Sequence, residues 1–351
     1  MSTINEYLQK TEKTSSCNFC DSINHSFIYS GLKDRTDITS HNFNIVRCNN
    51  CGLCFLEPQP TISEIKKHYT NSYRTGQGNC FKETNKPKLA VIIRRLKRLF
   101  LLKIFTGLNL PIAKKAFIRN HLSRLLEYFP RVADEVEENG LRVIPALNRG
   151  AKVLDIGFGG GLWMQIASDY GWKAAGVEID TQFVQSAKEA GYQVYLGDFL
   201  DINFGSSKFN FIRLNHVLEH MHYPKETLKK CKNLLVKDGY IYVRVPNFNS
   251  ASQILLGKNY YQLDIPRHLF FFDACSIKNI ATEIALKIEI IDYISNPVTW
   301  LNSFLNFDEL REIALHVKND KAACRYTLRG MGITLNDYAL GDDLIVLLRK
   351  T

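Results

Sequence analysis

The feature that most constrains this fold is a glycine-rich turn at the end of an apolar segment. In the string LDIGFGGG, Asp155, Gly157, Gly159 and Gly161 follow one another at two-residue intervals. Glycine is needed where the backbone takes torsions that side chains disfavour, or where a ligand must approach the main chain closely. The pattern predicts a strand-turn-helix unit for a nucleotide-like ligand, and on its own it also fits a dinucleotide.

Strands and helices are expected to alternate from this turn to the end of the chain. Apolar runs predict strands in residues 152–157, 173–179, 192–197, 209–214 and 240–246, and two late strands in 285–295 and 342–350. Helical periodicity lies between them, with Gly171, Gly191 and Gly239 as C-terminal stops. The alternation predicts an α/β domain with a parallel sheet and crossover helices over residues 150–351.

Acidic residues at three successive strand ends indicate which cofactor the turn binds. Asp155 would repel a pyrophosphate but attract an ammonium group, which S-adenosylmethionine carries and NAD lacks. Glu178 follows 23 residues later, where a ribose diol needs an acceptor, and Asp180 is the alternative. In the GDF turn, the Asp198 carboxylate suits the adenine amine and the Phe199 ring could pack on the base. The alternative reading makes these acids helix caps and turn residues.

With these motifs, residues 150–275 resemble class I S-adenosylmethionine-dependent methyltransferases. The matching strings are the DxGxGxG turn, the acid of GVEID and the GDF turn. The resemblance implies a Rossmann-like seven-stranded sheet of order 3-2-1-4-5-7-6 with strand 7 antiparallel. It also implies a set of cofactor-binding residues: Asp155, Gly157, Gly159, Gly161, Glu178, Ile179, Asp198, Phe199, Asn215 and His216.

The segment RLNHVLEHMHYPKE follows the fourth predicted strand, at the sheet edge where ligands of open α/β sheets bind. The resemblance implies that Glu219 and His220 face the methyl acceptor. An imidazole is a suitable general base, so His220 is the first candidate, although it could instead bond a backbone carbonyl. The second is His268, with Arg267 beside it for an anionic group. The histidine spacing lacks the geometry of an HExxH helix, so no metal site is expected here.

Methyltransferases that act on nucleobase or peptide-like amines have an asparagine or aspartate, two prolines and an aromatic residue after strand four. This chain has LNHVLEH at that place. Oxygen or carbon acceptors are therefore expected in preference to exocyclic amines.

Two CxxC pairs near the start of the chain predict a zinc-binding module over residues 1–60. Cys17 and Cys20 form the first pair, and Cys48 and Cys51 form the second. Twenty-seven residues lie between the two pairs, and Cys54 lies close by as a fifth sulfur. Four thiolates at this spacing fit a closed, tetrahedral structural Zn²⁺ site. The scattered remaining cysteines favour a reducing compartment over a disulfide framework.

A zinc module before such a domain resembles sugar methyltransferases and related enzymes of polysaccharide and natural-product pathways. Sugar C-methyltransferases carry a further domain after the catalytic one, whereas the 76 residues beyond Cys275 only complete the sheet. We therefore expect O-methylation of a sugar, nucleotide-sugar, glycan or natural-product precursor. The alternatives are sugar C-methylation, RNA methylation assisted by the zinc module, and a non-catalytic scaffold.

Residues 61–149 are expected to form a helical linker or lid. Residues 82–121 hold eleven lysines or arginines and one acid, so this segment has a net charge of +10. The whole chain has the same net charge. The basic and apolar positions in 86–119 suit a lid over a phosphorylated or lipid-linked acceptor, or contact with an anionic membrane surface; nucleic acid is disfavoured. With a polar N-terminus and no membrane-spanning stretch, a cytoplasmic or membrane-associated protein is expected. The oligomeric state stays open.

Overall fold

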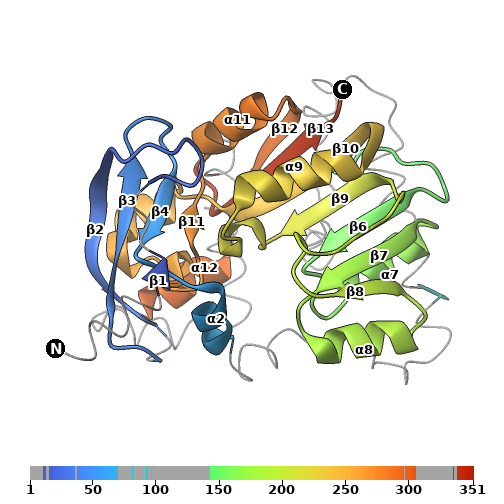
Figure 1. Ribbon diagram of the computed structural model, residues 1–351, viewed down its shortest axis with the longest axis horizontal. Coiled ribbons are helices and arrows are strands. Elements are labelled where there is room, and N and C mark those ends of the chain that lie inside the picture. The colour runs from blue at the N-terminus through green and yellow to red at the C-terminus, as the bar shows by residue number, and fades with distance from the viewer. Residues whose placement is uncertain are drawn as a thin grey trace.

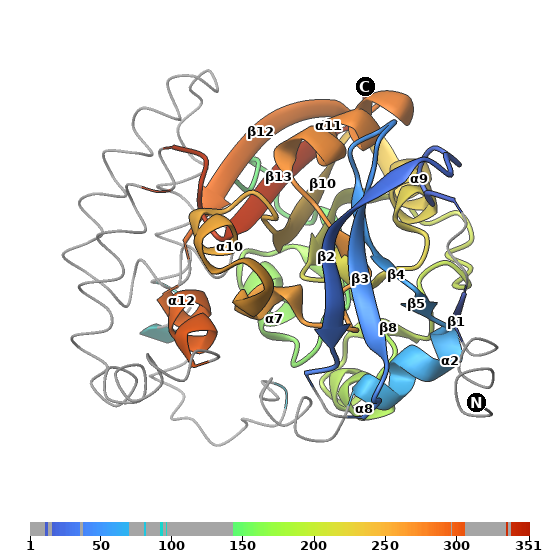
Figure 2. The same cartoon turned by 90° about the vertical axis from the view of Figure 1, so that its left-hand side faces the viewer.

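The computed structural model describes most of the chain outside the basic segment. It covers residues 11–12, 16–35, 38–69, 81, 92–93, 96, 143–295, 297–305, 335 and 338–351. Apart from residues 92–93 and 96, the predicted basic helices of 86–119 lie outside these described residues, as does most of the proposed linker 61–149. Two sheets stand beside each other, with helices on both faces of the larger one (Figures 1 and 2).

The larger sheet has seven strands in the spatial order β12-β13-β10-β9-β6-β7-β8. Their bounds are β6 Lys152–Ile156, β7 Lys173–Glu178, β8 Gln193–Leu196, β9 Phe209–Asn215, β10 Leu235–Pro246, β12 Lys287–Ile294 and β13 Asp343–Arg349. The first five pair in parallel, whereas β13 is antiparallel to both β10 and β12. Numbered along the chain, the order is 3-2-1-4-5-7-6, which confirms the expected sheet.

Helices cover the two faces of this sheet because successive strand residues point to opposite sides. Four helices pack here: α7 Leu162–Asp169, α8 Thr181–Glu189, α9 Pro224–Leu234 and α11 Ala274–Glu283. Leu228 of α9 and Ile277 of α11 join a core with Leu154, whereas Trp163 of α7 joins Val153 in another cluster. Helix α9 is shorter than expected, since Leu235 already pairs with β9.

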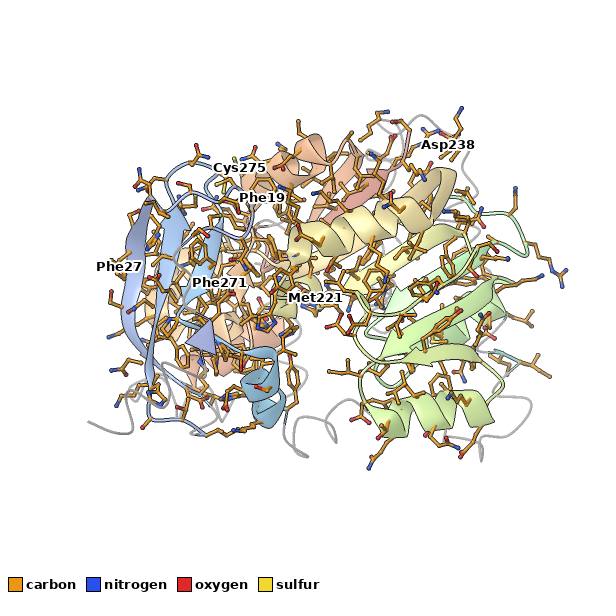
Figure 3. The ribbon with its side chains drawn as sticks, in the orientation of Figure 1. Phe19, Phe27, Met221, Asp238, Phe271 and Cys275 are labelled. Atoms are coloured by element: carbon orange, nitrogen blue, oxygen red, sulfur yellow. The ribbon has the colours of Figure 1, made fainter. Side chains whose placement is uncertain are left out.

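The smaller sheet takes its fourth strand from the catalytic part of the chain. Its order is β11-β4-β3-β2, with β2 His25–Lys33, β3 Asn42–Cys48, β4 Cys54–Glu57 and β11 Phe270–Phe271. Phe270 pairs with Phe55, and the main chain of Leu56 also bonds to Leu269. In Figure 3, Phe271 lies in the smaller sheet and Met221 between the two sheets, whereas Phe27 lies on the outer strand β2. One buried cluster joins residues of both sheets.

Shorter elements connect the two sheets. These are β1 Thr11–Glu12 paired with β5 Gln59–Pro60, α2 Ile62–Ile65, the 3-10 turns η1 Lys66–His68, η3 Leu218–His220, η4 Gly257–Asn259 and η5 Tyr261–Leu263, α10 Ala251–Leu256 and α12 Pro297–Phe304. Thr61 Oγ1 accepts a 3.3 Å hydrogen bond from the Glu64 N–H and thereby caps α2. Among the described helices, none combines the length and apolar character that crossing a bilayer demands.

Candidate active site

The glycine turn has the backbone conformation that its sequence requires. Gly157, Gly159 and Gly161 have φ angles of 67°, 50° and 78°, a region that favours glycine. A Cβ on Gly157 would lie 2.6 Å from Cγ2 of Val217, and one on Gly161 would lie 1.9 Å from the ring of Phe81. The turn is therefore packed closely by the segment after β9 and by an aromatic ring from the N-terminal half of the chain.

The Glu178 carboxylate closes the turn from the end of β7. Its Oε2 accepts a 2.9 Å hydrogen bond from the Gly159 N–H, and its Oε1 accepts bonds from Ile179 and Asp180 at 2.8 and 3.1 Å. Burial raises the pKa of Glu178, although the three N–H groups favour its ionised form. The acid expected at the ribose thus lies beside the glycine turn. Asp180, its alternative, instead caps α8 by accepting from the Gln182 N–H at 2.8 Å.

The Asp155 carboxylate, expected to receive the ammonium group of the cofactor, has a cationic partner within the chain. The side chain is 1% exposed, and Oδ1 lies 3.0 Å from a guanidinium nitrogen of Arg213 on the neighbouring strand β9. Arg213 lies between the rings of Trp163 and Tyr242, at 5.2 and 5.8 Å from their centroids. Burial raises the pKa of Asp155, and Oδ2 has no hydrogen-bond partner among the described residues. Nothing in the analysis of the sequence singled out Arg213, although it is a charge inside an apolar run.

The GDF turn divides into a surface residue and a core residue. Asp198 Oδ1 accepts a 2.8 Å hydrogen bond from the Leu200 N–H, which fixes the turn after β8. Phe199 is 2% exposed, its ring centroid lies 5.8 Å from that of Phe204, and Nζ of Lys230 lies 5.2 Å above it. The Phe199 ring, expected to pack on adenine, is therefore buried beside Phe204 and Lys230. Ile179, at the neighbouring strand end, is exposed.

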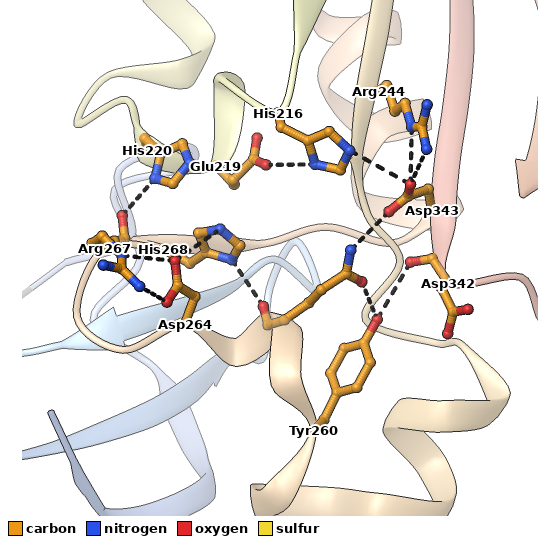
Figure 4. A network of polar contacts seen from close by, with 11 residues as sticks. His216, Glu219, His220, Arg244, Tyr260, Asp264, Arg267, His268, Asp342 and Asp343 are labelled. Carbon is orange, nitrogen blue, oxygen red and sulfur yellow. Dashed lines mark hydrogen bonds and ion pairs between the residues drawn. The ribbon is translucent and has the colours of Figure 1, made fainter. Parts of the chain in front are cut away.

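A charged network begins where β9 ends (Figure 4). Asn215 Oδ1 has no hydrogen-bond partner in the described part of the chain. The next residue, His216, has a φ of 53°, and its two ring nitrogens lie 3.4 Å from Glu219 Oε1 and 3.5 Å from Asp343 Oδ2. Arg244 Nε donates to the same Asp343 oxygen at 2.9 Å. Burial lowers the pKa of His216, but Asp343 and Glu219 raise it, to about 9. In turn, Arg244 and His216 lower the pKa of Asp343 against the effect of its burial.

Two histidines from distant segments form a pair at the same edge of the sheet. The rings of His220 and His268 lie 4.7 Å apart, edge to face. Nδ1 of His220 lies 2.9 Å from the Arg267 carbonyl, and Nδ1 of His268 lies 2.8 Å from the Gln262 carbonyl. A carbonyl only accepts, so Nδ1 carries a proton in each ring, and in the neutral form of the ring the lone pair lies on Nε2. Burial, together with His220, lowers the pKa of His268 to about 4.

Glu219 lies next to this pair and is completely buried. Neither of its carboxylate oxygens has a hydrogen-bond partner among the described residues, apart from the His216 contact at 3.4 Å. Burial alone would raise the pKa of Glu219, but the surrounding histidines lower it, so the group is ionised at neutral pH.

Further groups that the sequence did not single out surround the histidine pair. Asp264 accepts from Arg267 Nε at 2.8 Å, so the arginine expected to bind an anion is already paired. The Tyr69 ring lies 6.0 Å from that of His220, edge to face. Arg267 also donates to the His68 carbonyl at 3.3 Å. The segment after the cysteine pairs therefore reaches this site, which no periodic pattern in that segment could have revealed.

The four predicted cysteine ligands come together in space. The sulfur atoms of Cys17 and Cys51 lie 3.6 Å apart, those of Cys20 and Cys48 lie 3.5 Å apart, and all four lie within 4.8 Å of one another. Cys54 instead contacts Arg47 Nε at 3.4 Å, and burial raises its pKa to about 11. The fifth sulfur is therefore outside the group.

The chain matches a family model and is similar to several known proteins. Residues 126–289 match a family model described as "Methyltransferase domain". A ubiquinone biosynthesis O-methyltransferase of Glaesserella parasuis is 27% identical over 183 residues, and the match covers 45% of this chain and 75% of the relative. The ubiquinone biosynthesis O-methyltransferase of Haemophilus ducreyi is 26% identical over 175 residues, and the match covers 44% of this chain and 74% of the relative. A SAM-dependent methyltransferase structure from Archaeoglobus fulgidus is 18% identical with a TM-score of 0.39, covering 67% of this chain and 94% of that one.

The family match spans β6 to β10 and includes the glycine turn, the acid of β7 and the histidine segment. The sheet order and the antiparallel β13 match the expectation from the sequence resemblance. We therefore identify the chain as an S-adenosylmethionine-dependent methyltransferase with a class I catalytic domain.

Proposed function

We propose that this methyltransferase methylates an oxygen of a small-molecule acceptor and that His220 is the general base. The observation that carries the proposal is the anchored ring of His220, whose Nδ1 bonds the Arg267 carbonyl and whose Nε2 stays free to take a proton. His268, with a pKa lowered to about 4, is a poor proton acceptor at neutral pH and is better suited to orient the acceptor. Both relatives named above carry the name O-methyltransferase.

The residues at the strand ends fit S-adenosylmethionine, which supplies an electrophilic methyl group when bound. We assign the ribose hydroxyls to Glu178, whose carboxylate already faces the glycine turn. The adenine edge falls to Asp198 and the exposed Ile179, and the wall near the amino acid end falls to Asn215, whose Oδ1 is unpartnered in the described chain. Gly157 allows the backbone to approach the cofactor. Asp155 then acts by holding Arg213 in the sheet rather than by touching the ligand.

With the cofactor bound, Nε2 of His220 would take the proton of the acceptor hydroxyl while the hydroxyl oxygen bonds the methyl carbon and the carbon–sulfur bond breaks, with S-adenosylhomocysteine as the leaving group. The anchored ring keeps that lone pair aimed in one direction, so alignment contributes most of the acceleration. Glu219 lies beside the ring with an ionised carboxylate and favours the imidazolium that results.

For the acceptor we retain the proposal of a sugar, nucleotide-sugar or glycan precursor, with the ubiquinone-pathway acceptor of the relatives as the second candidate. Both are hydroxyl compounds, and the histidine pair fits either. The predicted lid, residues 86–119, would favour a phosphorylated or lipid-linked form, or contact with a membrane surface.

We propose further that Cys17, Cys20, Cys48 and Cys51 hold a structural Zn²⁺ ion. Zn–S bonds of about 2.3 Å in a tetrahedron place neighbouring sulfurs about 3.8 Å apart, and the two sulfur pairs lie 3.6 and 3.5 Å apart. The donor set is complete with four thiolates and leaves no open position for a substrate.

The test is a methyl-transfer assay with labelled cofactor against nucleotide sugars and ubiquinone precursors, in which NMR locates the new methyl group. A methyl ether is the expected product, and a methyl group on carbon or nitrogen would reject the proposal. For the base, His220→Ala should lower kcat by about 10²- to 10⁴-fold and restore part of the rate at high pH, where the acceptor ionises by itself. The His220→Ala variant should bind S-adenosylhomocysteine with the affinity of the wild type. If its rate also equals that of the wild type, His220 is not the general base.

A further inference from the structure

The group formed by Glu219, His220 and His268 has a property that general base catalysis does not use. One ligand atom of each residue lies within 4.8 Å of those of the other two. The residues come from different segments, since Glu219 and His220 lie in η3 after β9, whereas His268 precedes β11. Figure 4 shows the three side chains together at the carboxyl edge of the sheet. The segment after β9 therefore supplies two of the three grouped residues, and His268 supplies the third from a distant part of the sequence.

Each of the three groups has an atom that can donate an electron pair to a cation. Both histidines use Nδ1–H for a backbone carbonyl, so Nε2 is the nitrogen available to a ligand. The carboxylate of Glu219 is fully buried and, within the described residues, has no hydrogen-bond donor apart from the His216 contact at 3.4 Å. Three lone-pair donors in one buried place repel one another unless a proton or a cation lies between them.

We propose that Glu219, His220 and His268 form a mononuclear site for a divalent transition-metal ion. Two imidazole nitrogens and one carboxylate oxygen are the donor set of catalytic zinc and related sites, which keep one or more positions open. The Arg267 and Gln262 carbonyls hold the rings by Nδ1, as outer partners of metal-bound histidines do. Imidazole donors disfavour Mg²⁺ and Ca²⁺, which prefer oxygen.

The charges around the site agree with a dication. Glu219 contributes one negative charge, and the Asp264 carboxylate lies 3.8 Å from Nε2 of His268. Asp264 accepts a hydrogen bond from Arg267, and Asp343 accepts one from Arg244. His216 lies between Glu219 and Asp343. Glu219 is the carboxylate whose oxygen lies within 4.8 Å of a ring nitrogen of both histidines.

The role of this ion rests on the O-methylation of the proposed function, and in the metal-bound chain the ion would replace His220 as the group that activates the acceptor hydroxyl. An acceptor hydroxyl at an open position would have its pKa lowered, and its proton would leave to water. Nε2 of His220 would then bind the metal and would not accept the proton itself. The binding of the ion does not depend on any acceptor and can be measured alone.

The experiment uses the full chain with its four-cysteine site already filled with zinc. Zn²⁺ is titrated into it in a calorimeter, and Mn²⁺ is titrated separately while EPR follows free Mn²⁺. Thiolate ligands prefer zinc, so Mn²⁺ leaves the cysteine site untouched. The variants are Glu219→Gln, His220→Gln and His268→Gln, and the matched control is His222→Gln. His222 is buried in the same segment, but its Nε2 lies 2.8 Å from the Pro60 carbonyl, a contact that a glutamine amide can replace.

One further Zn²⁺ per chain is expected in the wild type and in the control. Each of the three ligand variants should bind it at least about tenfold more weakly, because even the outer partners of metal ligands contribute that much. Far-UV circular dichroism checks that the variants are folded. The proposal is overturned if neither ion binds beyond the cysteine site, or if a second ion binds equally well in all three variants. Failure of the proposed function appears separately, as the absence of a methyl ether in the transfer assay.

Discussion

The backbone N–H of Leu56 donates a 2.9 Å hydrogen bond to the carbonyl of Leu269. The Leu269 N–H in turn donates to the carbonyl of Glu219 at 2.8 Å. Leu56 lies on β4, two residues after Cys54, and Leu269 follows His268 directly. Two successive main-chain bonds therefore connect the cysteine-bearing sheet to the histidine and carboxylate of the active site.

This connection predicts that loss of zinc also impairs catalysis. Cys48→Ser should release the ion, lower Tm by roughly 5–10 °C and reduce kcat, because each kcal/mol lost moves Tm by about 2–4 °C in a chain of this size. Metal analysis, a thermal melt and the transfer assay measure the three effects. Affinity for S-adenosylhomocysteine should change little, because its proposed contacts lie at the ends of β6, β7, β8 and β9 and not on the small sheet.

The control for this prediction is Cys275→Ser, which removes an exposed thiol outside the group of four. It should keep the zinc, the melting temperature and the rate of the wild type. A Cys48→Ser protein that loses zinc but retains the full rate would show that the small sheet does not position the site.

Glu178 and Asp180 are two residues apart and should have separable effects. Glu178→Gln should weaken S-adenosylhomocysteine binding by about ten- to a hundredfold, since a lost hydrogen bond to a charged group is worth about 1.5–3 kcal/mol. Asp180→Ala should leave the affinity unchanged and remove about 1 kcal/mol of stability as a lost helix cap. Calorimetry gives the affinities and urea unfolding gives the stabilities. The reverse pattern would transfer the ribose role to Asp180.

The large sheet could be predicted from the sequence because its signals are local. Each strand is a run of apolar residues, and Gly171 and Gly191 end their helices with φ angles of 82° and 84°. These features need no knowledge of distant residues. The strand order came from the resemblance, since periodicity alone does not say which strands are neighbours.

The small sheet's fourth strand and the charged contacts of the site could not be predicted, because they depend on residues that are distant in the sequence. β11 has two residues, Phe270 and Phe271, and carries no periodic signal, yet it completes the small sheet. Arg213 is 58 positions from Asp155 in the chain but faces it across neighbouring strands. An arginine within FNFIRL was the available signal, because a buried charge needs a partner.

A side chain at Gly157 should be unfavourable because of the positive φ angle and because of a clash with Val217. A set of variants can separate these two effects. Gly150 has a φ of 82° and open space around its Cβ position, so Gly150→Ala should lose only the backbone term of about 1–2 kcal/mol. Gly157→Ala adds the clash with Val217 and should lose more stability as well as cofactor affinity. Combining it with Val217→Ala should recover part of the stability, as a double-mutant cycle would show. Equal losses for Gly150→Ala and Gly157→Ala would mean that the turn yields without contacting Val217.

His216 should make stability depend on pH above neutrality. Its pKa is raised to about 9 in the folded chain and is about 6.5 in an unfolded one. Between these values the folded state binds more protons, so this stabilisation is fully present below about pH 6.5 and is lost as the pH rises through about 9. His216→Gln should therefore flatten the fall of the urea midpoint across this range, whereas His222→Gln, whose ring contacts the Pro60 carbonyl instead of a carboxylate, should keep the wild-type slope. If His216→Gln keeps that slope as well, another group carries the proton, and the contacts of the ring with Glu219 and Asp343 do not persist in solution.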